Sequence, residues 1–289
     1  NLVYRNEGRM RFKREVLCKH YPGRLQAAVF ADFDNDGLTD LLGLPENSMP
    51  VFMKGAAGGV FNEPPKVIEV KLGAKNAGTC ITAGDIDNDG DLDAWVTQNK
   101  SPYDGGHMPT PYYDANDGYP SYLLVNDGKG RFTDQTEAAG LAAKRFRRSY
   151  SASFVDLDED TNQDLIVVSD FAGLDVYLND GKGHFTDVTD RLGNTRYSFG
   201  MSHALADFNG DGKLDLYMVG MGSTTARRLE RLKLGRKEFP EHQKARMRMG
   251  YGNRLFLGGA GGVLKQAAYN DLVARTGWAW GSTPLDFDN

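Results

Sequence analysis

Short apolar runs, separated by polar turns, recur along the whole chain. AAVFA at residues 27–31 precedes an acidic loop, and LLGL at 41–44 follows it. DLIVV at 164–168 and DLYMV at 215–219 follow two further loops of the same kind. Runs this short and this rich in Val, Leu and Ile are typical of β-strands rather than of amphipathic helices. Because the runs are apolar without alternation, we expect these strands to be covered on both faces.

A second motif alternates with these strands along the chain. It consists of an apolar run, a Gly-rich or Asn-Asp-Gly turn, and a second apolar or aromatic run. Turns of this composition between such runs are hairpin signals. The motif occurs at residues 2–12, 51–61, 122–134, 176–187 and 254–264.

Each repeat unit therefore holds four strands in about 50 residues, which is the content of one propeller blade. We predict an all-β fold, a β-propeller of four-stranded blades, with about five partial or complete blades in this chain. Residues 1–289 are expected to form a single domain, interrupted by insertions at 101–120 and 223–250. The sequence opens in a hairpin and ends inside an acidic loop, so we expect it to be truncated, with further blades or domains beyond it.

Four acidic loops of nine residues lie between the paired strands, and a fifth copy, DFDN, begins at Asp286. The complete loops read DFDNDGLTD from Asp32, DIDNDGDLD from Asp85, DLDEDTNQD from Asp156 and DFNGDGKLD from Asp207. Asp or Asn occupies loop positions 1, 3 and 5, and Asp closes each loop at position 9. Two carboxylates about 4 Å apart repel by roughly 4 kcal/mol at an effective dielectric constant of 20. The loops therefore need a cation.

Several observations predict that this cation is calcium. Calcium accepts six to eight oxygen ligands in irregular geometry, whereas magnesium demands a stricter octahedron and keeps its waters. The EF-hand alternative fails because that loop has twelve residues, ends in Glu and needs flanking helices. Asp, Asn and Gly could instead mark solvated turns. Four copies in register between apolar strands disfavour that alternative.

The residue at loop position 6 is expected to adopt a positive φ. Gly37, Gly90 and Gly212 suit such a sharp turn. Thr161 occupies this position in the third loop, and a β-branched residue is poorly suited to positive φ. We therefore expect Asn162 to take the left-handed conformation instead, and the third loop to be distorted or to bind calcium most weakly.

The two insertions are the candidate ligand-contacting segments. Residues 223–250 carry nine Lys or Arg against three Glu, and helical spacing with breaks at Gly235 and Pro240 predicts two short helices. Insertions at equivalent points of a repeat should emerge on one rim. The second insertion is either a solvated helical excursion packed on the rim or a site for an anionic ligand or acidic partner. The aromatic first insertion either covers a blade edge or stacks on sugars or anchors a protein. The residues that we single out as possible ligand contacts are Tyr103, Tyr112, Tyr113, Arg227 and Arg228. The basic stretch KRFRR at 144–148 is interpreted as a solvated connection between blades.

Composition and motifs exclude several function classes. Apolar residues make up 40% and charged residues 25%, as in an ordinary globular protein. A net charge of −5 argues against a nucleic-acid partner, and no apolar run is long enough to span a membrane. We find no G-x-S-x-G, H-E-x-x-H or P-loop motif, so an enzyme is not expected. His203 is expected to be a satisfied core or channel residue.

The paired motifs resemble FG-GAP/VCBS repeats, the calcium-loop blades of integrin α-subunit propellers and of many exported bacterial proteins. Phe199-Gly200 followed by ALADFNGDGKLDLYMVG carries the resemblance most closely. FTDQTEAAGL at 132–141 and GWAWGSTPLDFDN at the C-terminus are similar to the cartilage-acidic-protein-1-like, ASPIC/UnbV-associated subgroup. The resemblance implies a seven-bladed ring. It also implies calcium binding through positions 1, 3, 5 and 9, which here are Asp32, Asp34, Asp36, Asp40, Asp85, Asp87, Asp89, Asp93, Asp156, Asp158, Asp160, Asp164, Asp207, Asn209, Asp211 and Asp215.

Together these observations predict a non-catalytic, calcium-binding β-propeller that recognises a protein or a glycan in adhesion. Structural calcium and the resemblance place it outside the cytoplasm: extracellular, at the cell surface or periplasmic. One alternative is a polysaccharide lyase or hydrolase, with acidic and basic residues converging on a central pocket near His203. A second alternative is a scaffold joined to other domains.

Overall fold

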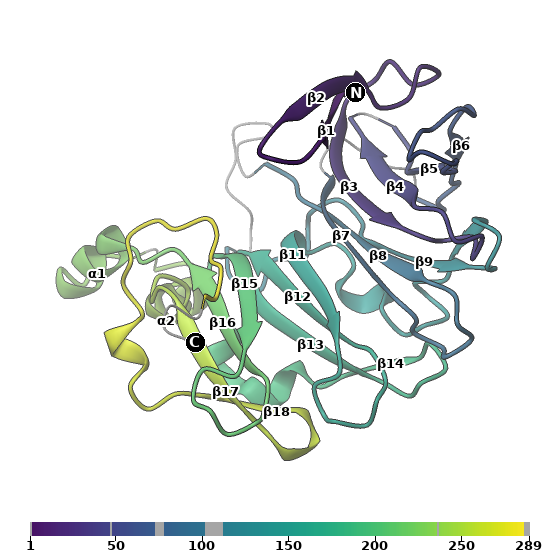
Figure 1. Cartoon of the computed structure of the whole chain (residues 1–289). Helices are drawn as coiled ribbons and strands as arrows, with labels where there is room; N and C mark the ends of the chain where they lie inside the picture. The colour runs from purple at the N-terminus through teal and green to yellow at the C-terminus, as the bar shows by residue number, and fades with distance from the viewer. Residues whose placement is uncertain (1, 47, 73–77, 102–111, 236, 286–289) are drawn as a thin grey trace.

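The structure, a computed structural model, describes residues 2–46, 48–72, 78–101, 112–235 and 237–285. Within these ranges the chain forms four four-stranded antiparallel sheets and one two-stranded hairpin, which follow one another in chain order (Figure 1). The hairpin pairs β1 (Leu2–Asn6) with β2 (Phe12–Val16), and most of its residues are exposed.

In each of the four sheets, consecutive strands pair in an up-and-down meander. The first sheet comprises β3 (Leu25–Ala31), β4 (Asp40–Pro45), β5 (Val51–Met53) and β6 (Lys66–Val67). The second comprises β7 (Gly78–Gly84), β8 (Asp93–Gln98), β9 (Tyr122–Asn126) and β10 (Phe132–Asp134). The third comprises β11 (Arg148–Val155), β12 (Asp164–Asp170), β13 (Gly173–Asn179) and β14 (Phe185–Asp187). The fourth comprises β15 (Gly200–Ala206), β16 (Asp215–Gly220), β17 (Arg254–Gly259) and β18 (Val263–Gln266).

The first strands of successive sheets lie side by side, in the order β3, β7, β11 and β15. This arrangement fits propeller-like blades, and it confirms the all-β class and the four-stranded units. The described residues form an open row of sheets rather than a closed ring (Figure 1). Ring closure and the count of seven blades therefore stay predictions.

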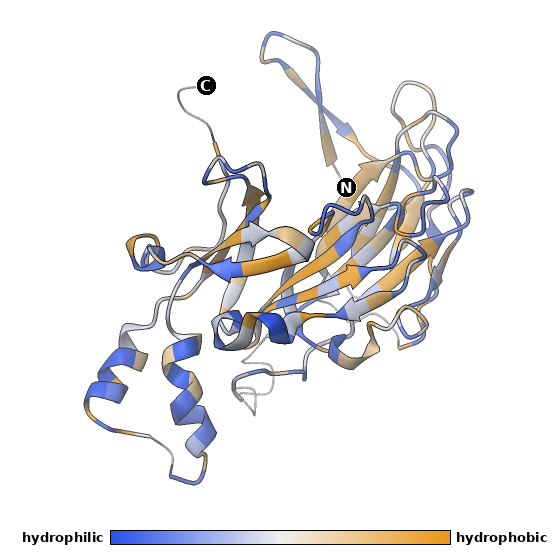
Figure 2. Cartoon of the chain, turned by 90° about the horizontal axis from the view of Figure 1, so that it is seen from below, coloured by the Kyte–Doolittle hydropathy of each residue, from blue (hydrophilic) through white to orange (hydrophobic). Residues whose placement is uncertain are grey.

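The second strand of each sheet packs on both faces, as its uninterrupted apolar sequence predicts. In β12, Leu165 and Val167 join a core with Trp95 of the second sheet. Ile166 and Val168 join a separate core with strands of the fourth sheet. Because side chains alternate between the faces of a strand, a single run of apolar residues supplies two cores. Figure 2 shows the resulting contrast between hydrophobic strands and hydrophilic loops.

One buried aspartate, at loop position 9, ties each sheet together. The Asp164 side chain is fully buried, and one of its oxygens accepts a hydrogen bond from the Leu157 amide at 2.9 Å. The other oxygen accepts one from the Asn179 amide of β13 at 2.8 Å. Asp164 thus joins the start of the loop, the second strand and the third strand. The same pair of bonds is made by Asp40, Asp93 and Asp215.

The third loop is not distorted, and the expectation for Asn162 is wrong. Thr161 itself adopts the left-handed conformation, with φ of 76°, close to the 83°, 90° and 84° of Gly37, Gly90 and Gly212. Its amide donates to Asp156 at 2.9 Å, as the Gly90 amide donates to Asp85 at 3.0 Å. The hydrogen bonds of the loop therefore hold a β-branched residue in a conformation that it disfavours.

The second insertion forms two short helices, as predicted: α1 (Thr224–Arg231) and α2 (Pro240–Met249). Ser223 caps α1 by accepting a hydrogen bond from the Ala226 amide at 3.0 Å. Ala245 and Met249 of α2 pack against Phe199 in one hydrophobic cluster. None of the helices in the described part of the chain is long and apolar enough to cross a bilayer.

The remaining helical turns are short 3₁₀ segments. They are η2 (Ala142–Lys144), η3 (Thr189–Arg196), η4 (Ala260–Gly262) and η5 (Asn270–Leu272). Of these, η2 and η3 lie between sheets and η4 lies at the turn between β17 and β18, whereas η5 follows β18, the last described strand.

The three arginines of the basic stretch at 144–148 are buried, so its interpretation as a solvated connection is wrong. Arg147 is 3% exposed and donates to Asp175 at 3.0 Å and to Asp114 at 2.6 Å. Arg148 donates to both carboxylate oxygens of Asp117, at 2.9 and 3.0 Å. Asp114 and Asp117 belong to the first insertion. The arginines therefore clamp the described end of that insertion onto the third sheet.

Removing the carboxylate at the centre of this network should destabilise the protein. Asp175 is 1% exposed and accepts from Lys144 and Arg147. Asp175→Asn removes one of the two carboxylates that neutralise the buried Arg147 guanidinium, the other being Asp114, so we expect the free energy of unfolding to fall by about 3 kcal/mol. Urea denaturation measures this change. Glu137→Gln, the same change at an exposed position, should stay within about 0.5 kcal/mol of the parent protein, and equal effects of the two variants would contradict the argument.

Relief of the strained threonine should stabilise the third loop. We expect Thr161→Gly to raise the free energy of unfolding by about 1 kcal/mol, because glycine carries no penalty for left-handed backbone, although its greater freedom in the unfolded chain offsets part of the gain. Gly90→Thr, the reciprocal change in the second loop, should lower the free energy of unfolding by a similar amount. A destabilising Thr161→Gly would show that the threonine side chain is needed there.

Candidate metal loops

The four acidic loops share one backbone conformation. In the second loop, Asp85 accepts hydrogen bonds from the amides of Asp89 at 3.2 Å and Gly90 at 3.0 Å. Asp89 accepts from the Asp91 amide at 2.9 Å. The equivalent bonds recur in the other three loops. Positions 4 and 6 have positive φ in every loop, which folds the chain tightly enough for positions 1, 3 and 5 to approach one another.

Carboxylate oxygens converge in three loops. The oxygens of each set lie within 4.8 Å of one another. The sets are Asp32, Asp34 and Asp36 in the first loop, Asp85, Asp87 and Asp93 in the second, and Asp156, Asp158 and Asp164 in the third. The sequence-predicted ligands at positions 1 and 3 are therefore brought together in these loops. Position 9 joins them in two.

The carboxylate at position 3 carries an unpaired oxygen. Oδ1 of Asp34, Asp87 and Asp158 is buried and accepts no hydrogen bond from any described residue. An unpaired buried carboxylate oxygen is costly unless it coordinates a cation. The same atom is left over in three independent copies. A hard cation at the loop centre fits this donor set.

The pKa values of several loop aspartates are raised, which is consistent with the same excess of negative charge. Burial, followed by repulsion from Asp89, raises the pKa of Asp87. Burial, followed by repulsion from Asp160, raises the pKa of Asp158. Burial raises the pKa of Asp93 to about 7, because its two backbone hydrogen bonds only partly compensate for lost solvation. A bound cation would favour the ionised form of each group.

The fourth loop fits a cation less completely. Its position 3 is Asn209, whose amide group donates to Asp211 at 3.0 Å and whose carbonyl accepts from the Asp211 amide at 2.8 Å. The backbone of this loop has the same conformation as in the other copies, so its positions 1, 3 and 5 are placed in the same way. The Asp207 carboxylate accepts from three amides, and its pKa is lowered chiefly by the bond from Gly212. The fifth copy, from Asp286, lies outside the described residues.

The first loop contains a cation of its own, which the sequence analysis missed. The Lys54 ammonium contacts the Asp34 carboxylate and lies 2.6 Å from Oδ2 of Asp36. The pKa of Asp36 is accordingly lowered, first by its hydrogen bond with Lys54. A register-by-register comparison of the third strands could have found Lys54, because the equivalent positions are apolar in the other sheets.

Neighbouring loops are linked by a repeating side-chain contact. Position 4 of each of the first three loops meets position 7 of the next. Asn35 donates to Asp91 at 2.5 Å, and Asn88 donates to Asn162 at 3.0 Å. Lys213 donates to Glu159 at 3.0 Å. The four loops therefore form a continuous hydrogen-bonded row along one edge of the sheets.

The two insertions contact each other through aromatic side chains. The rings of Tyr112 and Tyr113 lie 5.3 and 5.4 Å from the ring of His242 in α2. Arg227 is half-buried and Arg228 is exposed on α1. Tyr103 lies outside the described residues. A ligand-contacting role for these residues stays a prediction.

His203 is hydrogen-bonded rather than free. Its ring nitrogens lie 3.0 Å from the Ser151 hydroxyl and 2.8 Å from the Ser153 hydroxyl, both on β11. Burial lowers the pKa of His203 to about 4, so the ring is neutral at pH 7. These contacts match the expected role of a satisfied interior histidine.

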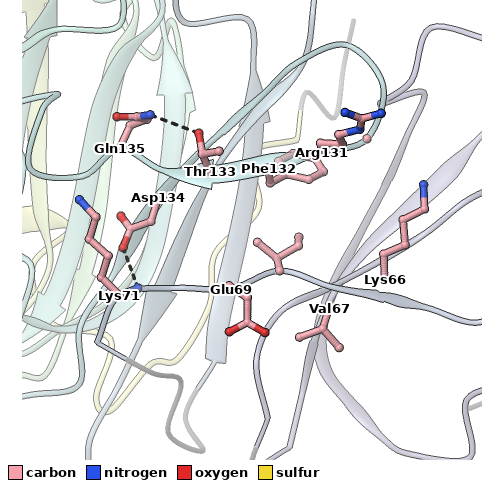
Figure 3. Close-up of a pocket in the computed structure, with 11 residues that line it drawn as sticks. Lys66, Val67, Glu69, Lys71, Arg131, Phe132, Thr133, Asp134 and Gln135 are labelled. Carbon is pink, nitrogen blue, oxygen red and sulfur yellow. Dashed lines mark hydrogen bonds between the residues drawn. The ribbon is translucent and has the colours of Figure 1, made fainter.

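A separate cavity lies between the outer strands of the first two sheets. It has a volume of about 590 Å³ and is lined by residues 66–69, Lys71 and 130–135 (Figure 3). Lys66, Lys71 and Arg131 face it together with Glu69 and Asp134. Neither His203 nor a loop aspartate lines this cavity.

Comparison with solved structures finds distant similarity. A biofilm matrix protein of V. cholerae, Bap1, matches with a TM-score of 0.37 and 16% identity, over 70% of this chain and 25% of its own. A putative exo-beta-1,3-galactanase from Bifidobacterium bifidum s17 matches with a TM-score of 0.40 and 14% identity, over 70% and 63%. The exotype rhamnogalacturonan lyase YesX matches with a TM-score of 0.36 and 12% identity, over 84% and 48%. The chain thus spans less than two thirds of each of these proteins.

No curated protein matches the chain in sequence. The model of the FG-GAP-like repeat matches residues 32–96 and 156–218. Each matched segment begins at the first residue of an acidic loop and ends in the second strand of a later sheet. The specific likeness to integrin propellers and to the ASPIC/UnbV-associated subgroup stays a prediction. With its four-stranded sheets and repeated aspartate loops, the chain carries FG-GAP-like repeats.

Proposed function

We propose that this chain is a non-catalytic, calcium-stabilised recognition module that works outside the cytoplasm and binds a protein or a glycan. The observation that carries the calcium part is the buried, unpaired Oδ1 of the position-3 aspartate in the second and third loops, Asp87 and Asp158. In these two loops the aspartates at positions 1, 3 and 9 converge and would hold the ion. Calcium suits this set of oxygens better than magnesium does, because the set is irregular and supplied almost entirely by protein.

Calcium would act here on folding rather than on chemistry. It would neutralise side chains that lie between the first and second strands of a sheet. The position-9 aspartate already ties this loop to the third strand, so an ion would strengthen a junction of three backbone segments. Because the ion binds the folded loop and not the unfolded chain, its binding free energy adds to stability.

The recognition part of the proposal is supported by the rim formed by the two insertions. The described end of the first insertion is held by the buried arginines, and α2 is held by its apolar contacts with Phe199. On this rigid base, α1 presents Arg227 and Arg228. A basic, partly exposed helix on such a base suits an acidic protein surface or an acidic glycan.

Calcium removal should lower the melting temperature. A site at 100 times its dissociation constant contributes about 2.7 kcal/mol. For the two loops that fit an ion best, we expect a chelator to lower the melting temperature by roughly 10 °C or more. Differential scanning calorimetry measures the shift, and added calcium should reverse it where equal magnesium does not. An unchanged melt, with calcium removal verified by elemental analysis, would rule out structural calcium.

Charge reversal on α1 should weaken recognition without unfolding the protein. We expect Arg227→Glu with Arg228→Glu to weaken binding to an acidic ligand at least tenfold, about 1.4 kcal/mol. The ligand is first identified in two screens, one on an array of acidic glycans and one by cross-linking to extracellular proteins. Lys129→Glu with Lys182→Glu, in two exposed hairpin turns, is the matched control. Equal binding by both double variants would place the contact elsewhere, and no ligand in either screen would contradict a recognition role.

A further inference from the structure

The first loop differs from the others in one charged contact. The Lys54 ammonium touches the carboxylate of Asp34 and lies 2.6 Å from Oδ2 of Asp36. The Asp34 side chain is only 10% exposed, so this contact lies within the protein surface rather than in open solvent. A positive charge therefore already sits against the carboxylates at loop positions 3 and 5.

The strand register shows that this lysine is a departure from the repeat. Gly55, the residue after Lys54, donates its amide to Asp40 at loop position 9. Asn126, Asn179 and Gly258 make the same bond to Asp93, Asp164 and Asp215. The position of Lys54 is therefore occupied in the other three described sheets by Val125, Leu178 and Leu257. Those apolar side chains cannot neutralise a carboxylate.

The arrangement of carboxylates changes in the same loop. In the second and third loops, the converging set includes positions 1, 3 and 9. In the first loop it consists of positions 1, 3 and 5, the last two of which share the ammonium. In the first loop, the cluster therefore contains position 5, which contacts Lys54. In the second and third loops, it contains position 9 instead.

We propose that the Lys54 ammonium takes the place of a calcium ion in the first loop, so that this loop is neutralised from within and binds no calcium. The proposal rests on calcium binding by the second and third loops. A divalent ion held by Asp34 and Asp36 would lie within a few ångströms of the ammonium, and the two cations would repel each other. Admitting the ion would also require Lys54 to break both of its contacts.

As a consequence, the loops along the row differ in whether they need calcium to stay folded. The first sheet keeps its loop folded at any calcium concentration, while the second and third need the ion. Because Asn35 of the first loop donates to Asp91 of the second, the calcium-independent loop borders directly on a calcium-dependent one.

Counting bound calcium tests the proposal. The ions bound by the full chain are measured by equilibrium dialysis with elemental analysis, for the parent protein, Lys54→Leu and the matched control Lys129→Leu. Leucine reproduces the side chain found at this position in two other sheets. We expect Lys54→Leu to bind one calcium more than the parent protein, and Lys129→Leu to bind the same number.

Two further variants keep the test decisive if Lys54→Leu does not fold. In the presence of Lys54, Asp34→Asn should leave the calcium count unchanged, whereas Asp87→Asn, the same change in the second loop, should lower it by one. A loss of one ion in Asp34→Asn, or equal non-zero counts for Lys54→Leu and the parent, overturns the proposal and leaves calcium binding elsewhere intact. No bound calcium in any variant overturns both.

Discussion

A fully buried aspartate at the end of each acidic loop joins three pieces of backbone that are distant in sequence. In the third sheet, Asp164 accepts one hydrogen bond from the loop at Leu157 and another from β13 at Asn179. A carboxylate with both oxygens bonded to amides can remain buried at a low dielectric, where an unpaired one could not. Loop, second strand and third strand are thereby set in one register. This residue and the left-handed turns at positions 4 and 6 together fix the loop conformation in which the other side chains approach one another.

The row of loops extends this local arrangement from sheet to sheet. Each contact between positions 4 and 7 crosses from one sheet to the next, beside the hydrophobic cores that the second strands share. The same edge therefore combines apolar packing, hydrogen bonds and concentrated negative charge.

Lysine and arginine side chains neutralise carboxylates in two different settings in this protein. At the first loop, Lys54 supplies the positive charge at the surface, within reach of two carboxylates. At the third sheet, Arg147 and Arg148 are buried against Asp114, Asp117 and Asp175, where they fasten an insertion. The two guanidinium groups of Arg147 and Arg196 lower the pKa of Asp114 although burial opposes the shift. Both arrangements place a lysine or arginine where a carboxylate would otherwise be costly to keep ionised.

The sequence by itself determined the strands, the hairpins, the repeat and the approach of loop positions 1 and 3 in the first three loops. These follow from local rules: apolar runs that need burial, glycine and asparagine at turns, and aspartates at fixed spacing. It could not show that Thr161 keeps the left-handed conformation, that the arginines at 145–148 are buried, or that Lys54 reaches the first loop. Those outcomes depend on which segments become neighbours in space. A charged side chain is solvated or buried according to the carboxylate that the fold brings to it, and only the tertiary structure decided that pairing.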